Sequence, residues 1–168
     1  LHFWGSYGVV GDSRRWYRQE VRVVRNDRQI RSWGDAQGFR KNGEKLCVAP
    51  VDAAVYHYGW VKPPKAQQAK QQSFHRYWHS DGWIERTIPK TEEFDYRRDD
   101  FLAPFTGTHP AVMHQRVADQ DWVFDPGQAA KPSPKARFLR WIEKRTGWRP
   151  GEYRNFTIFA QNRTHGFK

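Results

Sequence analysis

Alternating apolar and polar positions predict short strands in the first third of the chain. Residues 19–25 place valines on one side and Glu or Arg on the other, and residues 30–33 could return after an Asn-Asp turn. The clearest alternation runs over residues 51–58, and Gly59 followed by Pro63-Pro64 ends it. We therefore predict three strands before residue 60, the last of which ends at an exposed turn.

Apolar residues at intervals of three and four predict helices in the rest of the chain. One helix is expected over residues 65–79, after Pro64, and a short one after Pro110, with Val112, Met113 and Val117 inward. The clearest helix begins at Ser133-Pro134 and ends at Gly147. Between these elements we expect irregular chain at 36–42 and 80–107, and a last strand within 153–160.

The chain is strongly basic and rich in aromatic residues. It has 29 Lys and Arg against 18 Asp and Glu, which gives a formal net charge of +11. This charge favours polyanionic partners such as nucleic acid, nucleotide phosphates or an anionic membrane surface. The 9 Trp, 7 Tyr and 11 Phe argue against a disordered chain. Sugars and nucleobases both pack on flat rings, so composition alone does not separate these two ligand classes.

The length of the chain limits the number of domains, and its cysteine content limits the disulfides that it can form. At 168 residues the chain is long enough for one domain with a core of its own. We expect a single domain over 1–168 from a longer protein, because the sequence does not open on methionine. The single cysteine, Cys47, excludes an internal disulfide, fits a reducing compartment and is expected in the core. Strands first and helices later indicate a mixed α+β fold without an internal repeat.

His57 is the first candidate for chemistry. It lies within the segment VYHYGWV (55–61), where a predicted strand reaches a glycine turn. A histidine at a rigid strand end beside an exposed loop is well placed to bind a metal or move a proton. The alternative is a core histidine packed between Tyr56 and Tyr58.

Two further groups have both a chemical and a structural interpretation. His75 and His79 are four residues apart on a predicted helix, with Asp81 just beyond, as in a zinc-binding helix. An exposed helix face explains the same residues. Asp35 lies near Gly34 and Gly38 and could be a general base in a cleft, although aspartate is also common in turns.

Four motifs in order resemble the C-terminal half of a bacterial family 2-type glycosyltransferase. They are EVRVVRN (20–26), WGDAQGF (33–39), VYHYGWV (55–61) and Lys70. GTHP (107–110), Met113 and WVFD (122–125) resemble the tail of one subgroup. The resemblance covers residues 1–125, which would leave 126–168 as an extension of one helix and one strand. It implies the acceptor-side part of a GT-A type α/β fold, with the nucleotide-binding half outside this chain.

The resemblance also implies roles for individual residues. Asp35 would be the general base that deprotonates the acceptor hydroxyl, where the family more often has His-Glu and this chain has Gly34-Asp35. His57 would lie beside the metal and the diphosphate. The residues expected to contact substrate are Trp60, Lys62, Lys70, Tyr58 and Arg25. An inverting transfer needs such a base and such cations, because a hydroxyl loses its proton while negative charge builds on the leaving diphosphate.

The expected function is therefore transfer of a sugar from a nucleoside-diphosphate donor to a glycan or lipid-linked acceptor of the bacterial cell envelope. A divalent metal, Mg or Mn, would be the cofactor. The enzyme would act in the cytoplasm, at the inner face of the membrane. Contact with an anionic membrane fits the charge. A nucleic-acid-binding module is the main alternative, although no module signature supports nucleic acid as a partner. A metal-dependent hydrolase built on His75, His79 and Asp81 comes last.

Overall fold

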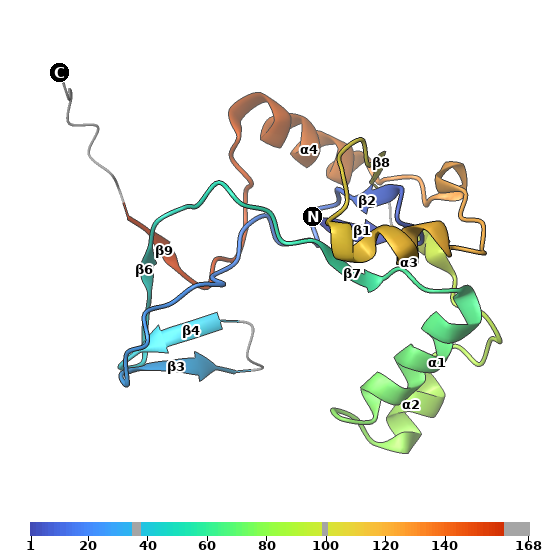
Figure 1. The fold of residues 1–168 in the computed structure, drawn as a ribbon, viewed down its shortest axis with the longest axis horizontal. Helices are drawn as coiled ribbons and strands as arrows, with labels where there is room; N and C mark the ends of the chain where they lie inside the picture. Colours follow the sequence, from blue (N-terminus) through green and yellow to red (C-terminus); the bar gives the residue numbers. More distant parts are fainter. Residues whose placement is uncertain (35–37, 99–100, 160–168) are drawn as a thin grey trace. The chain divides into compact units, whose positions relative to one another are not determined.

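The computed structural model describes residues 1–34, 38–98 and 101–159 (Figure 1). Two units are distinguished by their internal packing: unit 1 contains residues 1–16 and 54–138, and unit 2 contains residues 17–53 and 139–168. Strands and helices occur together, which confirms the mixed α+β class. The single-domain organisation stays a prediction.

Unit 1 is built on a four-stranded sheet in the order β7-β1-β2-β8 (Figure 1). The strands are β1 (His2–Trp4), β2 (Val9–Gly11), β7 (His57–Trp60) and β8 (Leu102–Pro104). β1 pairs parallel with β7 and antiparallel with β2, and β2 pairs antiparallel with β8. β1 is one of the two inner strands and carries the most buried side chains of the sheet, Phe3 and Trp4.

Phe3 and Trp4 are adjacent in a strand and so point to opposite faces of the sheet. Phe3 is fully buried and stacks on Tyr58, with ring centroids 4.6 Å apart, while the edge of Phe105 meets it at 4.9 Å. The other side chains of this core cluster are Tyr7, Val61, Val10, Tyr56, Met113, Val117 and Trp122. Burial of these apolar and aromatic surfaces holds this side of unit 1 together.

Trp4 anchors a second aromatic cluster on the opposite face. Its indole Nε1 donates a 2.7 Å hydrogen bond to the backbone oxygen of Tyr96, and the Tyr96 hydroxyl donates to the backbone oxygen of Lys62. Burial raises the pKa of the Tyr96 hydroxyl, which therefore stays a neutral donor. Trp60 and Phe94 complete the cluster around Trp4. Buried hydrogen bonds thus tie β1 to the chain that follows β7.

The helices of unit 1 all come after β7 in the sequence. They are α1 (Pro64–His75), α2 (Asp81–Thr87) and α3 (His114–Ala118), with short 3-10 helices η1 (Tyr96–Arg98), η2 (Ala111–Met113) and η3 (Pro126–Gln128). Pro64 suits the first position of α1, where a backbone N–H is not needed. The predicted helix over 65–79 is confirmed in position, but it ends at His75.

Three predictions for residues 51–117 are wrong. The strand expected over 51–58 begins only at His57, and Val51 and Val55 are exposed because no strand covers them. The segment 80–107 contains α2 and β8 rather than only irregular chain. Val112 points outward and is 86% exposed, whereas Met113 and Val117 do pack on the core.

Unit 2 contains two small sheets. β3 (Ile30–Trp33), β4 (Gly38–Lys41) and β5 (Glu44–Lys45) form an antiparallel sheet, and β6 (Cys47–Val48) pairs parallel with β9 (Thr157–Ile158). Asn42 and Gly43, with φ of 52° and 86°, form the tight turn between β4 and β5, because this turn needs positive φ at both positions. The Asn-Gly pair is a sequence signal for this turn. The loop expected over 36–42 is wrong for residues 38–41, because these residues form β4.

The strand predicted over 19–25 is also wrong, since these residues form no strand in the structure. Val23 is 87% exposed, so the alternating valines do not form a buried face. Arg22 forms a local ion pair with Glu20, two residues away. Cys47 is exposed and not in the core.

Helix α4 (Pro134–Thr146) confirms the clearest helix prediction. The Ser133 hydroxyl accepts a hydrogen bond from the backbone N–H of Ala136 and so caps the first turn. Gly147 ends the helix with a φ of 69°, and its N–H donates to the backbone oxygen of Glu143.

Candidate functional site

A break in register between β1 and β7 brings two candidate side chains to one face of the sheet in unit 1. His2 pairs with His57, and Trp4 pairs with Trp60, so that two steps along β1 match three steps along β7. In a regular strand His57 and Trp60 would point to opposite faces. The extra residue in β7 reverses the alternation, and His57 and Trp60 both lie on the face of His2 and Trp4.

Gly59 is in contact with both the imidazole of His57 and the ammonium of Lys70. The ring of His57 lies over the Gly59 Cα, where an added Cβ would come within 2.6 Å of His57 Cε1. Lys70 Nζ on α1 donates a hydrogen bond to the backbone oxygen of the same glycine. The same Nζ lies 5.7 Å from the centroid of the Trp60 ring. One glycine thus positions an imidazole, an ammonium and an indole near each other.

Aromatic rings extend this group across the sheet face. The His57 and His2 rings are 5.2 Å apart, His2 stacks on Trp16 at 4.9 Å, and Trp16 meets the edge of Trp60 at 6.3 Å. We call His2, Trp16, His57, Trp60 and Lys70 the β7 site. His57 is exposed and the other four are half-buried, so the rings are accessible at an ordered surface.

The Lys70 ammonium is only partly solvated. Burial, and to a smaller extent the neighbouring charge of Lys62, lowers the pKa of Lys70 below its ordinary value. Both effects disfavour the positive charge, and the attraction of a bound anion would offset their cost. The charge at the β7 site is therefore suited to an anionic ligand.

The structure places the other predicted substrate residues differently. Tyr58 lies on the opposite face in the core cluster, where its hydroxyl is 2.8 Å from His109 Nδ1 and burial raises its pKa. Lys62 is exposed just after β7. Arg25 is exposed in unit 2, and Asp35 lies outside the described residues. The structure therefore brings together His57, Trp60 and Lys70, and their roles stay predictions.

The residues described do not by themselves fit a metal ion. No group of three or more His, Cys, Asp or Glu side chains within residues 1–34, 38–98 and 101–159 is arranged to hold one. His2 and His57 are near each other, but two imidazoles are fewer protein ligands than zinc sites ordinarily have. No chemical step is therefore derived through a metal.

The second histidine pair is engaged in stacking. His79 stacks on Trp83 of α2 at 3.6 Å, and His75 lies 5.3 Å from the same ring. Asp81 faces Arg76 at 3.9 Å. These contacts join α1 to α2 and account for the i, i+4 histidines by packing.

Sequence reasoning did not single out His2, Trp16 or Gln67. The short segment Leu1-His2-Phe3-Trp4 shows the alternation of a strand, and that signal could have placed His2 beside Trp4. Trp16 follows β2 in irregular chain and gives no such signal. Gln67 is fully buried one turn before Lys70, and its side-chain amide has no hydrogen-bond partner among the described residues.

No protein-family model, curated protein or solved structure matches this chain. In the part of the chain that the structure describes, no helix has both the length and the apolar character needed to cross a membrane.

Proposed function

We propose that the chain is the acceptor-side part of a sugar-nucleotide-dependent glycosyltransferase of GT-A type. The supporting observation is the break in register in β7, which puts His57 and Trp60 on one face beside Gly59, the residue whose backbone oxygen Lys70 binds. These are three of the residues for which the motif order implies a place beside the diphosphate and the sugar. The β7 site would then receive the diphosphate–sugar part of the donor.

The chemistry of the β7 site suits a departing nucleoside diphosphate. Negative charge builds on the leaving group during transfer, and cations held nearby stabilise it. Lys70 is positioned for this by Gly59 and Trp60, and Lys62 adds an exposed charge. Trp60 and Trp16 are half-buried, and the exposed parts of their indoles offer apolar surface against which a sugar or a base can pack.

The remaining roles follow from the resemblance. Asp35 would take the proton of the acceptor hydroxyl, and Arg25 would contact substrate. His57 would approach a metal–diphosphate whose other ligands come from outside the described residues. The acceptor would be a glycan or a lipid-linked molecule at the cytoplasmic side of a bacterial membrane.

The decisive measurement is nucleotide-sugar turnover by the gene product that contains this chain. We expect Lys70→Met to lower kcat/KM by about a hundredfold, the usual cost of removing one charge-stabilising group. Lys65→Met, on the same helix but exposed, is the matched control and should change kcat/KM less than about twofold.

Three results would contradict the proposal. One is the absence of turnover with every nucleoside-diphosphate sugar in a broad panel. Another is that neither Lys70→Met nor Lys65→Met changes kcat/KM. The third is turnover by the 168-residue chain alone, which would exclude a split site, since the nucleotide-binding half is expected elsewhere.

A further inference from the structure

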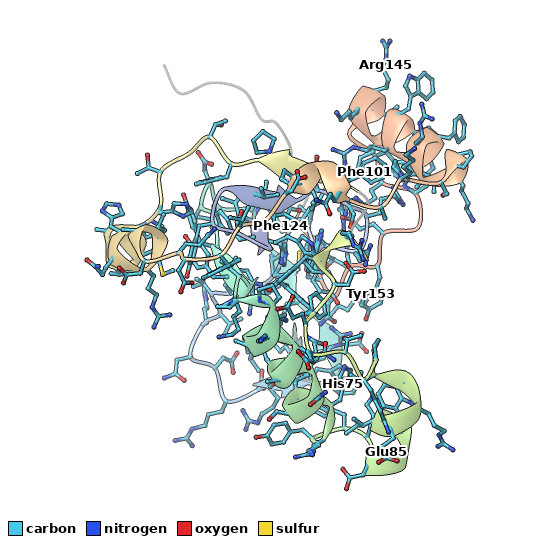
Figure 2. The ribbon with its side chains drawn as sticks, turned by 90° about the vertical axis from the view of Figure 1, so that its right-hand side faces the viewer. His75, Glu85, Phe101, Phe124, Arg145 and Tyr153 are labelled. Carbon is cyan, nitrogen blue, oxygen red and sulfur yellow. The ribbon has the colours of Figure 1, made fainter. Side chains whose placement is uncertain are left out.

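Helix α4 has an exposed face that is both aromatic and cationic. Phe138 is 60% and Trp141 is 57% exposed, and their spacing of three residues puts them on one side of the helix. Arg137, Lys144 and Arg145 are exposed next to them on the same side. Figure 2 shows the Arg145 side chain directed away from the ribbon at the end of α4.

The acidic and aliphatic residues of α4 do not belong to this face. Glu143 is the one carboxylate in the helix sequence, and it is half-buried in a 2.8 Å ion pair with Arg149. Leu139 and Ile142 are half-buried as well. The exposed face therefore combines two large rings with three cations and no carboxylate.

We propose that this face of α4 docks on the surface of a membrane that contains anionic lipids. Phe138 and Trp141 would enter the boundary between headgroups and acyl chains, and Arg137, Lys144 and Arg145 would contact lipid phosphates. Amphipathic helices with aromatic rings among Lys and Arg bind such surfaces through apolar burial and charge attraction together. The proposal does not depend on the glycosyltransferase function, because vesicle binding is measured without turnover.

Charge complementarity selects an anionic partner, and the shape of the face selects a lipid surface. Nucleobases stack on aromatic platforms inside basic grooves. Phe138 and Trp141 instead project from a single helix, with cations on their flanks that can reach headgroups while the rings insert. Nucleic acid is therefore the competing outcome of the experiment.

The charge part is tested by sedimentation of the 168-residue chain with vesicles of phosphatidylcholine, with or without about 30% phosphatidylglycerol, an anionic content sufficient for electrostatic attraction. We expect binding to the anionic vesicles, at least about tenfold weaker binding to the neutral ones, and weakening by salt. The triple variant Arg137→Glu, Lys144→Glu, Arg145→Glu should bind the anionic vesicles at least about tenfold more weakly than the parent chain. The control carries the same charge change elsewhere: Arg76→Glu, Arg86→Glu, Arg116→Glu.

The insertion part is tested with Phe138→Ser, Trp141→Ser, which should weaken vesicle binding about tenfold or more. The control, Val112→Ser, Val123→Ser, removes two side chains that are 86% and 93% exposed outside α4. Far-ultraviolet circular dichroism verifies folding of each variant. A spin label on Trp141→Cys in a Cys47→Ser chain gives an independent readout, since it should become accessible to oxygen and not to a polar nickel reagent.

Three outcomes would overturn the proposal. The first is failure of the chain to bind anionic vesicles. The second is a loss of vesicle binding in the control variants as large as that in the α4 variants. The third is a label at position 141 that stays in water when vesicles are bound. Tighter binding to a random oligonucleotide than to vesicles, lost in the same α4 variants, would assign the face to nucleic acid instead.

Discussion

His57 and Trp60 lie on the same face of the sheet although three residue steps separate them, because β7 carries one more residue than β1 between their paired positions. The alternation of a regular strand would separate the imidazole from the indole. This departure from regular pairing, centred on Tyr58 and Gly59, creates the β7 site. Sheet irregularities are common next to functional sites for this reason.

Gly59→Ala tests the position of the imidazole. The new methyl group would come within 2.6 Å of His57 Cε1, so the imidazole ring has to shift from its position. We expect kcat/KM for nucleotide-sugar transfer to fall at least about tenfold, because misplacement of a catalytic group by about 1 Å can cost about a hundredfold. Gly82→Ala on α2 is the control, because no atom lies within 4 Å of its added methyl group. Equal activities of the two variants would argue against the arrangement.

His57→Ala and Tyr58→Phe should separate chemistry from packing. We expect His57→Ala to lower turnover far more than stability, because the ring is exposed. Tyr58→Phe removes the hydrogen bond to His109 and should lower the free energy of unfolding by about 0.5–1.5 kcal/mol. Its turnover should stay near that of the parent chain. Denaturant titration and initial rates measure both quantities, and the reverse pattern would make His57 the structural residue.

Gln67 and Gln68 make a matched pair on α1. Gln67 is fully buried without a hydrogen-bond partner among the described residues, whereas Gln68 Nε2 donates to the backbone oxygen of Pro89 at 2.7 Å. Gln67→Met should therefore raise the free energy of unfolding by about 1 kcal/mol, and Gln68→Met should lower it by about 1 kcal/mol. Chemical denaturation distinguishes the signs. Destabilisation by Gln67→Met would mean that its amide is satisfied in the folded protein.

Acid should weaken unit 2 through Glu152. A hydrogen bond from Arg18, with a second from Arg154, lowers the pKa of Glu152 to about 2 from an ordinary value of 4.5. A depressed folded-state pKa gives stability that is present above pH 4.5 and is lost as the pH falls toward 2. Glu152→Gln should flatten this dependence in unfolding titrations between those pH values. An unchanged slope would show that Glu152 has the same proton affinity in both states.

The sequence predicted the elements whose signals are local. Ser133, Pro134 and Gly147 bound a helix through capping and backbone conformation, and these effects need no distant partner. The strand predicted over residues 19–25 was wrong, because an alternating segment forms a strand only when another strand pairs with it. The motif order named His57, Trp60 and Lys70, but local alternation could not predict that His57 and Trp60 share one face, since the break in register depends on the pairing of β7 with β1.

Each of the two units is built from two segments that are far apart in the sequence, and this affects how the protein folds. Unit 1 uses residues 1–16 and 54–138, and unit 2 uses 17–53 and 139–168, so that their segments interleave. β1 meets β7 across 55 residues and β6 meets β9 across 110. At about 5–20 residues per second of synthesis, β6 waits about 5–22 s for its partner. Both units close long loops, which slows folding, and no single cut of the gene yields either unit whole.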